Sequence, residues 1–190
     1  MRKDLGSLPG VFPMPVLMVA TYGEDGKVDV MNVAWGNVCG MDKIALNLAP
    51  ERKTLKNIRA KKAFTVALAD EAHIKEADFL GTASGNVMAD KFERTGLHAV
   101  KSSHVDAPII EEFPVTLECE VAEIRDSFGE VKVTGTIVNV SADEKVLDAA
   151  GKVDAGKLNA IMFDQFQNSY YTVGSKIAEA WRVGAEFMKK

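Results

Sequence analysis

Polar and aromatic residues interrupt an apolar, β-like run that ends at Cys39. Asn32, Trp35 and Asn37 place two amides and an indole within it. An amide both donates and accepts hydrogen bonds, and an indole offers a flat apolar face beside them. The run therefore predicts a binding surface for a planar ligand that forms hydrogen bonds.

A basic corner follows the next apolar run. Arg52 and Lys53 precede Thr54, which is a good N-cap for a helix over Leu55–Lys62. The free N–H groups of a helix N-terminus, with cations nearby, bind phosphate. We expect the Thr54 hydroxyl and amide to contact such a phosphate. An ordinary capped surface helix has the same pattern, and the corner taken alone favours that simpler interpretation.

Other patterns argue against catalysis by the protein alone. The sequence contains no nucleophile elbow, no His pair at metal-ligand spacing, no G-x-G-x-x-G motif and no Walker loop. Cys39 and Cys119 lack Cys-x-x-Cys spacing, so we expect neither a disulfide framework nor a metal site. An oxidoreductase made from this chain would need a cofactor to carry the electron chemistry.

Length and composition predict a single ordered domain over residues 1–190. Of the 190 residues, 47% are hydrophobic and 26% are charged, and the net charge is −4. The acidic balance argues against nucleic acid as a partner. Pro13 and Pro15 interrupt the first apolar patch, so we expect a strand rather than a signal peptide, and no run could span a membrane. Reduced cysteines favour the cytoplasm.

Hydrophobic alternation predicts a mainly β chain with peripheral α-helices. We expect an antiparallel, closed or partly closed barrel. The expected strands are 16–22, 27–39, 44–49, 63–69, 115–122 and 131–140.

The expected helices and irregular segments complete this outline. Asp70 should cap a helix that ends at Leu80 before Gly81, and a short helix should cover 90–95. Residues 1–14 form an arm, and 97–112 and 145–156 read as irregular. Helical spacing of apolar residues predicts an amphipathic helix over 175–190, with Ile177, Trp181, Ala185 and Met188 on one face.

The order of these motifs resembles the flavin reductase-like family, and within it the flavoredoxins most closely. The resemblance covers about residues 15–171, and it implies an antiparallel FMN-binding split β-barrel. The motifs are Asn32 with Trp35, Arg52-Lys53-Thr54, Ser84-Gly85, Asp90-Lys91-Phe92 and Tyr170-Tyr171-x-x-Gly174.

The resemblance also implies roles for particular residues. Asn32, able to bond a ring or ribityl oxygen, would border the flavin with Val33, Ala34 and Trp35, while Val38 and Cys39 would line its ring edge chiefly through the main chain. Arg52, Lys53 and Thr54 would hold the phosphate, Ser84 and Gly85 would form a loop near it, and Lys91 would reach the same cofactor. Phe163 or Phe166, and Tyr171, would cover the ring, from the same or a second subunit.

Three of these residues have simpler interpretations. Trp35 could be a core aromatic and Lys91 a solvated helix charge, each as well supported by the residues alone as the flavin role. Cys39 is better explained as a packed thiol than as a redox centre. Relatives often carry a histidine where this chain has Glu130-Val131-Lys132, so no proton-donating or nicotinamide-orienting role is carried over from that position.

The resemblance implies a homodimeric oxidoreductase that passes electrons from NADH or NADPH through FMN to a free flavin, a metal complex or a partner protein. Two alternatives stay open. One is a non-catalytic FMN electron carrier, and the other is a barrel that serves as a ligand- or partner-binding module. A nucleic-acid-binding barrel is the least favoured.

Overall fold

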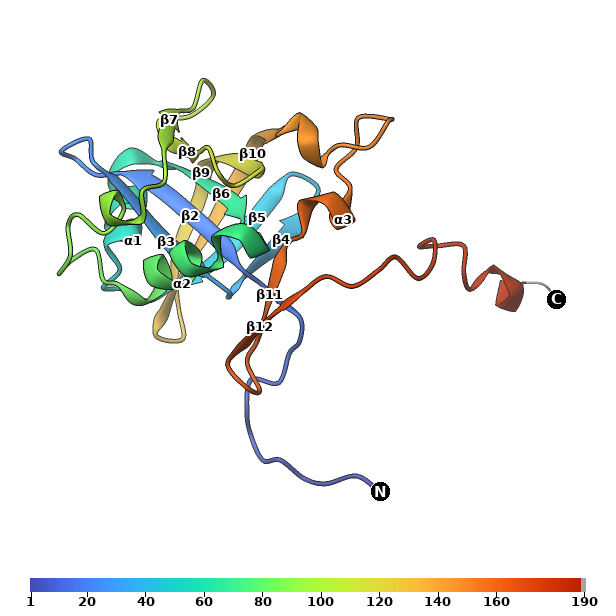
Figure 1. Cartoon of the computed structure of the whole chain (residues 1–190). Helices are drawn as coiled ribbons and strands as arrows, with labels where there is room; N and C mark the ends of the chain where they lie inside the picture. The colour runs from blue at the N-terminus through green and yellow to red at the C-terminus, as the bar shows by residue number, and fades with distance from the viewer. Residues whose placement is uncertain (189–190) are drawn as a thin grey trace.

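A seven-stranded sheet in which every pairing is antiparallel dominates the structure, a computed structural model that describes residues 1–188. Its strand order is β3-β2-β6-β9-β10-β5-β4 (Figure 1). The strands are β2 (Leu17–Tyr22), β3 (Val28–Val33), β4 (Gly36–Gly40), β5 (Lys43–Leu48), β6 (Ala63–Leu68), β9 (Val115–Ser127) and β10 (Glu130–Ala142).

The two edges of this sheet come together in space. β3 and β4 stand at opposite ends of the strand order, yet only Ala34 and Trp35 separate them in the chain. The sheet must therefore curl until its edges are neighbours, which leaves a split between them. The N–H of Asn47 on β5 donates to the Trp35 carbonyl at 2.8 Å and ties the link to the second edge. The predicted mainly β, antiparallel split barrel is confirmed.

The expected single strand over 27–39 is wrong, because the chain bends at Ala34 and Trp35 and splits it into β3 and β4. β3 pairs with β2, whereas β4 pairs with β5. The apolar run continues across the bend, so strand propensity carries no sign of the change in partner.

Two smaller sheets flank the barrel. β1 (Met14–Pro15), β11 (Ile161–Asp164) and β12 (Ser169–Thr172) form one, and β7 (Ala99–Lys101) and β8 (Pro108–Ile110) form the other. The expectation that 97–112 is irregular is thus wrong for β7 and β8. Strands of three residues are too short to produce a recognisable alternation.

Short helices lie against the barrel: α1 (Lys53–Lys61), α2 (Ile74–Thr82) and α3 (Ala155–Leu158), with 3₁₀ turns at Glu71–His73, Glu93–Thr95, Glu144–Val146 and Ala185–Met188. Asp70 is a cap, as predicted, but of the 3₁₀ turn Glu71–His73 that precedes α2, since its side chain accepts the His73 N–H at 3.0 Å. Gly81 does not end α2, which runs on to Thr82. A Cβ at Gly81 would lie 2.8 Å from Cβ of Asn32, so glycine allows α2 to approach β3 closely.

Apolar side chains fill both faces of the curled sheet. One cluster, including Leu46, Phe64 and Cys119, fills the barrel interior, and a second lies between the sheet and α2. Cys119 is the packed core thiol that the strand alternation predicts, and burial raises its pKa to about 12. Apolar packing on both faces therefore stabilises the sheet and fixes the strands that border the split.

Both chain ends form arms that leave the barrel (Figure 1). The α-helix expected over 175–190 is wrong for 175–188, where the structure has only the 3₁₀ turn Ala185–Met188, and residues 189 and 190 lie outside the described part. Ile177 and Trp181 are each 96% exposed. A helix this short is marginal in water unless its apolar face packs against something. Within residues 1–188, we find no helix with the length and apolar character needed to cross a membrane.

Candidate functional site

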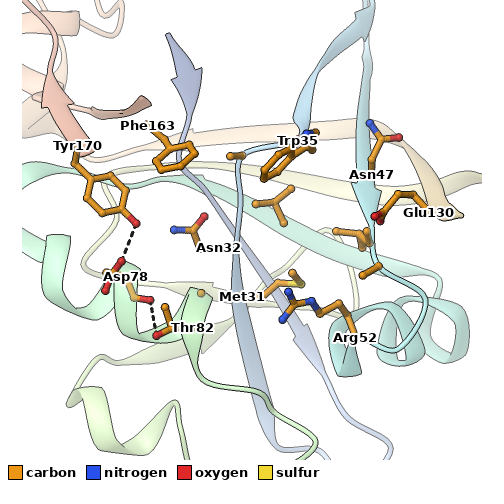
Figure 2. A pocket seen from close by; sticks show the side chains of 15 residues that line it. Met31, Asn32, Trp35, Asn47, Arg52, Asp78, Thr82, Glu130, Phe163 and Tyr170 are labelled. Atoms are coloured by element: carbon orange, nitrogen blue, oxygen red, sulfur yellow. Dashed lines mark hydrogen bonds between the residues drawn. The ribbon is translucent and has the colours of Figure 1, made fainter. Parts of the chain in front are cut away.

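A cavity of about 410 Å³ lies at the split between the two edges of the barrel (Figure 2). β3 and the link after it form one wall, the end of β5 and Arg52 a second, and α2 a third, while Phe163 on β11 and Tyr170 on β12 close the side. This volume falls within the range of small-molecule sites.

Six predicted site residues line this cavity: Asn32, Val33, Ala34, Trp35, Arg52 and Phe163. The bend that splits the expected strand places the first four there. Trp35 is 50% exposed, so the alternative of a core aromatic is wrong. Figure 2 shows its indole and the Phe163 ring on the same side of the cavity. Aromatic rings beside amide groups form a surface suited to a flat polar molecule.

The basic corner adjoins the cavity as a narrow cleft of about 10 Å³, and Arg52 lines both. The cleft contains the other residues predicted for the phosphate end, namely Lys53, Thr54, Ser84, Gly85 and Lys91. A volume of that size holds about one water molecule. An anion would therefore contact the mouth of the cleft rather than enter it.

Thr54 is not the N-cap of α1. The helix begins at Lys53, Arg52 occupies the cap position, and no side chain of the described residues caps it. The Thr54 hydroxyl instead donates to Oδ2 of Asp29 at 2.5 Å. Asp29 is only 2% exposed, and a buried carboxylate needs such donors. The amides of Thr54 and Leu55 make no backbone hydrogen bond in the described chain, so the end of the helix still offers N–H donors.

Lys91 is buried, so its interpretation as a solvated helix charge is wrong. Its Nζ donates to the carbonyls of Leu80 at 3.1 Å and Ala83 at 3.2 Å, and lies 3.8 Å from Asp29 Oδ1. Burial lowers the pKa of Lys91, and the charge of Asp29 opposes that shift. The Lys91 and Asp29 charges offset each other, which leaves Arg52 and Lys53 as the cations of the corner.

Four predicted residues lie outside the cavity and the cleft: Val38, Cys39, Phe166 and Tyr171. Val38 and Cys39 lie on the edge strand β4, where both are exposed. The interpretation of Cys39 as a packed thiol is therefore wrong within this chain. Phe166 is exposed, and Tyr171 packs edge-on against Phe12 with ring centroids 5.8 Å apart. A contribution of these residues to the site of a second subunit stays a prediction.

Sequence reasoning missed nine lining residues, among them the polar side chains of Asn47, Asp78, Glu130 and Tyr170. The Tyr170 hydroxyl donates to Oδ1 of Asp78 at 2.9 Å. Burial, and next Asp78, raise the pKa of Tyr170 to about 12. Tyr170 belongs to the tail motif, which was a usable signal. Nothing in the sequence near Asp78 distinguishes it from other exposed helix carboxylates.

The side chains at the split fit an aromatic ligand with an anionic tail. Trp35 and Phe163 offer apolar ring faces, and Asn32 and Asn47 offer amide groups. Arg52 lies where the cavity meets the cleft, beside the free amides of α1. Guanidinium groups and helix amides are both preferred partners of phosphate. FMN, with a flat ring and a terminal phosphate, has this combination.

Comparison with known proteins finds a matching family model and several similar structures. Residues 9–162 match the model of the flavin reductase like domain. The flavoredoxin of Desulfovibrio vulgaris (Miyazaki F) is 32% identical, with a TM-score of 0.92 over 97% of this chain and 100% of that one. The flavoredoxin of Methanosarcina acetivorans is 22% identical, with a TM-score of 0.87 over 99% and 98%.

An FMN-binding protein from Thermus thermophilus is 18% identical, with a TM-score of 0.77 over 94% of this chain and 99% of that one. This likeness and the one to the Methanosarcina protein establish the fold alone. A curated protein of Aeropyrum pernix is 28% identical over 144 residues, which are 72% of this chain and only 55% of that protein.

Proposed function

The chain belongs to the flavin reductase-like family, and from that premise we propose that it is an FMN-dependent oxidoreductase. The observation that carries the proposal is the cavity at the split, where aromatic and amide side chains meet a basic helix N-terminus. FMN would supply the electron chemistry, because the chain has no redox group of its own suited to it.

The residues of the chain would divide the work of binding. Trp35 and Phe163 would pack against the flavin ring and exclude water from it. Arg52 and Lys53, with the free amides of α1, would bind the phosphate. Lys91 would act from behind this corner by neutralising Asp29, whose charge would otherwise repel an anion.

We propose NADH or NADPH as the electron donor and a free flavin, a metal complex or a partner protein as the acceptor. The half-exposed Trp35 supports this, because a cavity open at one face leaves room for a second planar molecule beside the first. Glu130 lies in the cavity wall and would weaken the binding of a donor that places a phosphate beside it.

The alternative function is an electron carrier that holds FMN without a productive nicotinamide site. Measuring the turnover of NADH or NADPH distinguishes the carrier from the oxidoreductase. Purified protein loaded with FMN should consume NADH or NADPH under air, or with excess riboflavin as acceptor, at a rate proportional to protein concentration. Retention of FMN without such turnover would establish the carrier. A colourless protein that takes up no FMN would favour a ligand- or partner-binding module.

We also propose a homodimer in the cytoplasm. The C-terminal arm supports the dimer, since Ile177, Trp181 and Phe187 are exposed and a second copy would cover them. The unpaired state of Cys39 and Cys119 supports a reducing compartment.

A further inference from the structure

The side-chain amide of Asn32 is held in one orientation. Its Nδ2 donates to the carbonyl of Ala77 on α2 at 3.5 Å. The same nitrogen faces the hydroxyl of Tyr170 in Figure 2. Turning the amide over would bring Oδ1 against the Ala77 carbonyl, and two acceptors repel each other. Both N–H groups of Asn32 are therefore directed away from the centre of the cavity.

Tyr170 is fixed in turn by two contacts. Its hydroxyl donates its single proton to Asp78 Oδ1 at 2.9 Å, so the side of its oxygen that faces Asn32 can act only as an acceptor. Its ring lies tilted against Phe163, with centroids 5.9 Å apart and an interplanar angle of 53°. The three polar residues thus form a directional series: an N–H of Asn32 faces the Tyr170 oxygen, and Tyr170 donates to Asp78.

Oδ1 of Asn32 is the group that this series leaves free. Figure 2 shows it on the side of the amide turned away from Tyr170 and Asp78. An oxygen with two lone pairs at the wall of a partly enclosed cavity requires a donor from the ligand, and leaving it unpaired costs affinity. Asn32 would thus accept a hydrogen bond from the ligand, whereas the family resemblance implies that it donates one to an oxygen of the flavin.

We propose that Asn32 presents a fixed hydrogen-bond acceptor to the cavity, which selects planar ligands that carry an N–H group at that edge, and that Tyr170 and Asp78 are the positioning residues that fix it. This inference rests on the proposed function, because the imide N–H of the flavin ring is the donor of that kind which FMN supplies. Rings that offer only acceptors at this edge would bind more weakly.

The test compares FMN with FMN methylated on its imide nitrogen, each titrated into apoprotein by fluorescence. The wild type should bind FMN at least about tenfold more tightly, the scale of one hydrogen bond with an acceptor left unpaired. Asn32→Ala removes the acceptor and makes room for the methyl group, so the ratio should fall close to one. Tyr170→Phe should lower the ratio as well, because the amide loses a partner that fixes it.

Two further variants separate positioning from general structure. Asp78→Asn keeps an acceptor for the Tyr170 hydroxyl and should preserve most of the ratio, whereas Asp78→Ala should reduce it. Tyr22→Phe is the control: it removes a hydroxyl at the end of β2, from a residue that does not line the cavity, and should leave the affinity ratio unchanged. If the wild type binds both flavins equally, or Asn32→Ala keeps the wild-type ratio, this inference is overturned and the proposed function is not affected. If neither flavin binds to the wild type, the proposed function is overturned with it.

Discussion

The Thr54 hydroxyl lies 2.5 Å from Oδ2 of Asp29 and donates its proton to that carboxylate. Both residues are at most 2% exposed, so this hydrogen bond joins the first turn of α1 to β3 inside the protein. The sequence predicts Thr54 for the phosphate corner, and the structure places it in the cleft beside the cavity. The hydroxyl is directed into the interior, however, and within the described residues the main-chain N–H of Thr54 has no backbone acceptor.

Replacing Thr54 should therefore lower stability first. Thr54→Val keeps the shape of the side chain but leaves Asp29 without its closest donor, so the free energy of unfolding should fall by roughly 1.5–3 kcal/mol. Thr54→Ser keeps the hydroxyl and should lose much less. Denaturant unfolding of the apoprotein measures both. A Thr54→Val variant as stable as the wild type would mean that the bond to Asp29 contributes nothing.

Arg52 should carry the selectivity for phosphate, because it connects the cavity with the cleft and has no carboxylate partner within salt-bridge distance in the described chain. Arg52→Gln should weaken FMN about tenfold or more and leave riboflavin nearly unchanged, since riboflavin has no phosphate. The difference should shrink at high salt.

Arg59→Gln is the matched control for this experiment. Arg59 lies on the same helix, in its last turn, and it is half exposed beside Asp126. Its loss should affect neither flavin. Equal weakening of FMN and riboflavin by Arg52→Gln would show that the phosphate is not held at this corner.

The parts of the fold that sequence reasoning predicted well are those in which local pattern and tertiary environment agree. β9 and β10 alternate apolar and polar residues because one face of each lies in the barrel core, and both strands were recognised. The bend at Ala34 and Trp35 was missed because residues on both sides of it suit a strand. Ile177 and Trp181 have helical spacing, but nothing within the chain packs against them.

Two short segments account for much of the predicted site, and the family resemblance added Phe163, Ser84, Gly85 and Lys91 from other parts of the chain. Asn32 to Trp35 and Arg52 to Thr54 are short segments, and both lie at the split. Asp78, Glu130 and Tyr170 come from three distant parts of the chain, and only the curl of the sheet brings them to one cavity. The burial of Lys91 has no local signal either, because it depends on Asp29 and on the end of α2.

The two cysteines should differ in reactivity, and neither should be needed for electron transfer. Cys39 is exposed on β4 and should react readily with a disulfide reagent at pH near 8. Cys119 is buried with its pKa raised to about 12, so it should react only when the protein unfolds. Reagent titration of native and denatured protein should count one thiol and then two.

A variant with both Cys39→Ala and Cys119→Ala should keep most of its rate of flavin reduction, because neither thiol has a partner for a local disulfide. Loss of the rate by several orders of magnitude with FMN still bound would contradict this. The single variant Cys119→Ser keeps nearly the size of the side chain but places a hydroxyl in the core, so comparison with Cys119→Ala separates the effect of polarity from that of lost packing.

The C-terminal arm should hold two copies together. Sedimentation of the intact chain at micromolar concentration should give twice the mass of one chain. Trp181→Asp and Ile177→Asp each place a charge on the arm and should shift the protein towards the monomer, without unfolding a barrel that the arm does not help to build. A wild-type protein that sediments as a single chain would refute the dimer.

The central claim is that the cavity at the barrel split binds FMN, and a titration of the apoprotein with FMN tests it most directly. Flavin fluorescence should change in a saturable manner, reach its end point at one FMN per chain, and do so at micromolar concentrations or below. Trp35→Ala should weaken this binding, because Trp35 forms the half-exposed wall of the cavity. A wild-type titration with no saturable change, or a binding curve that Trp35→Ala and Arg52→Gln both leave unaltered, would contradict the account.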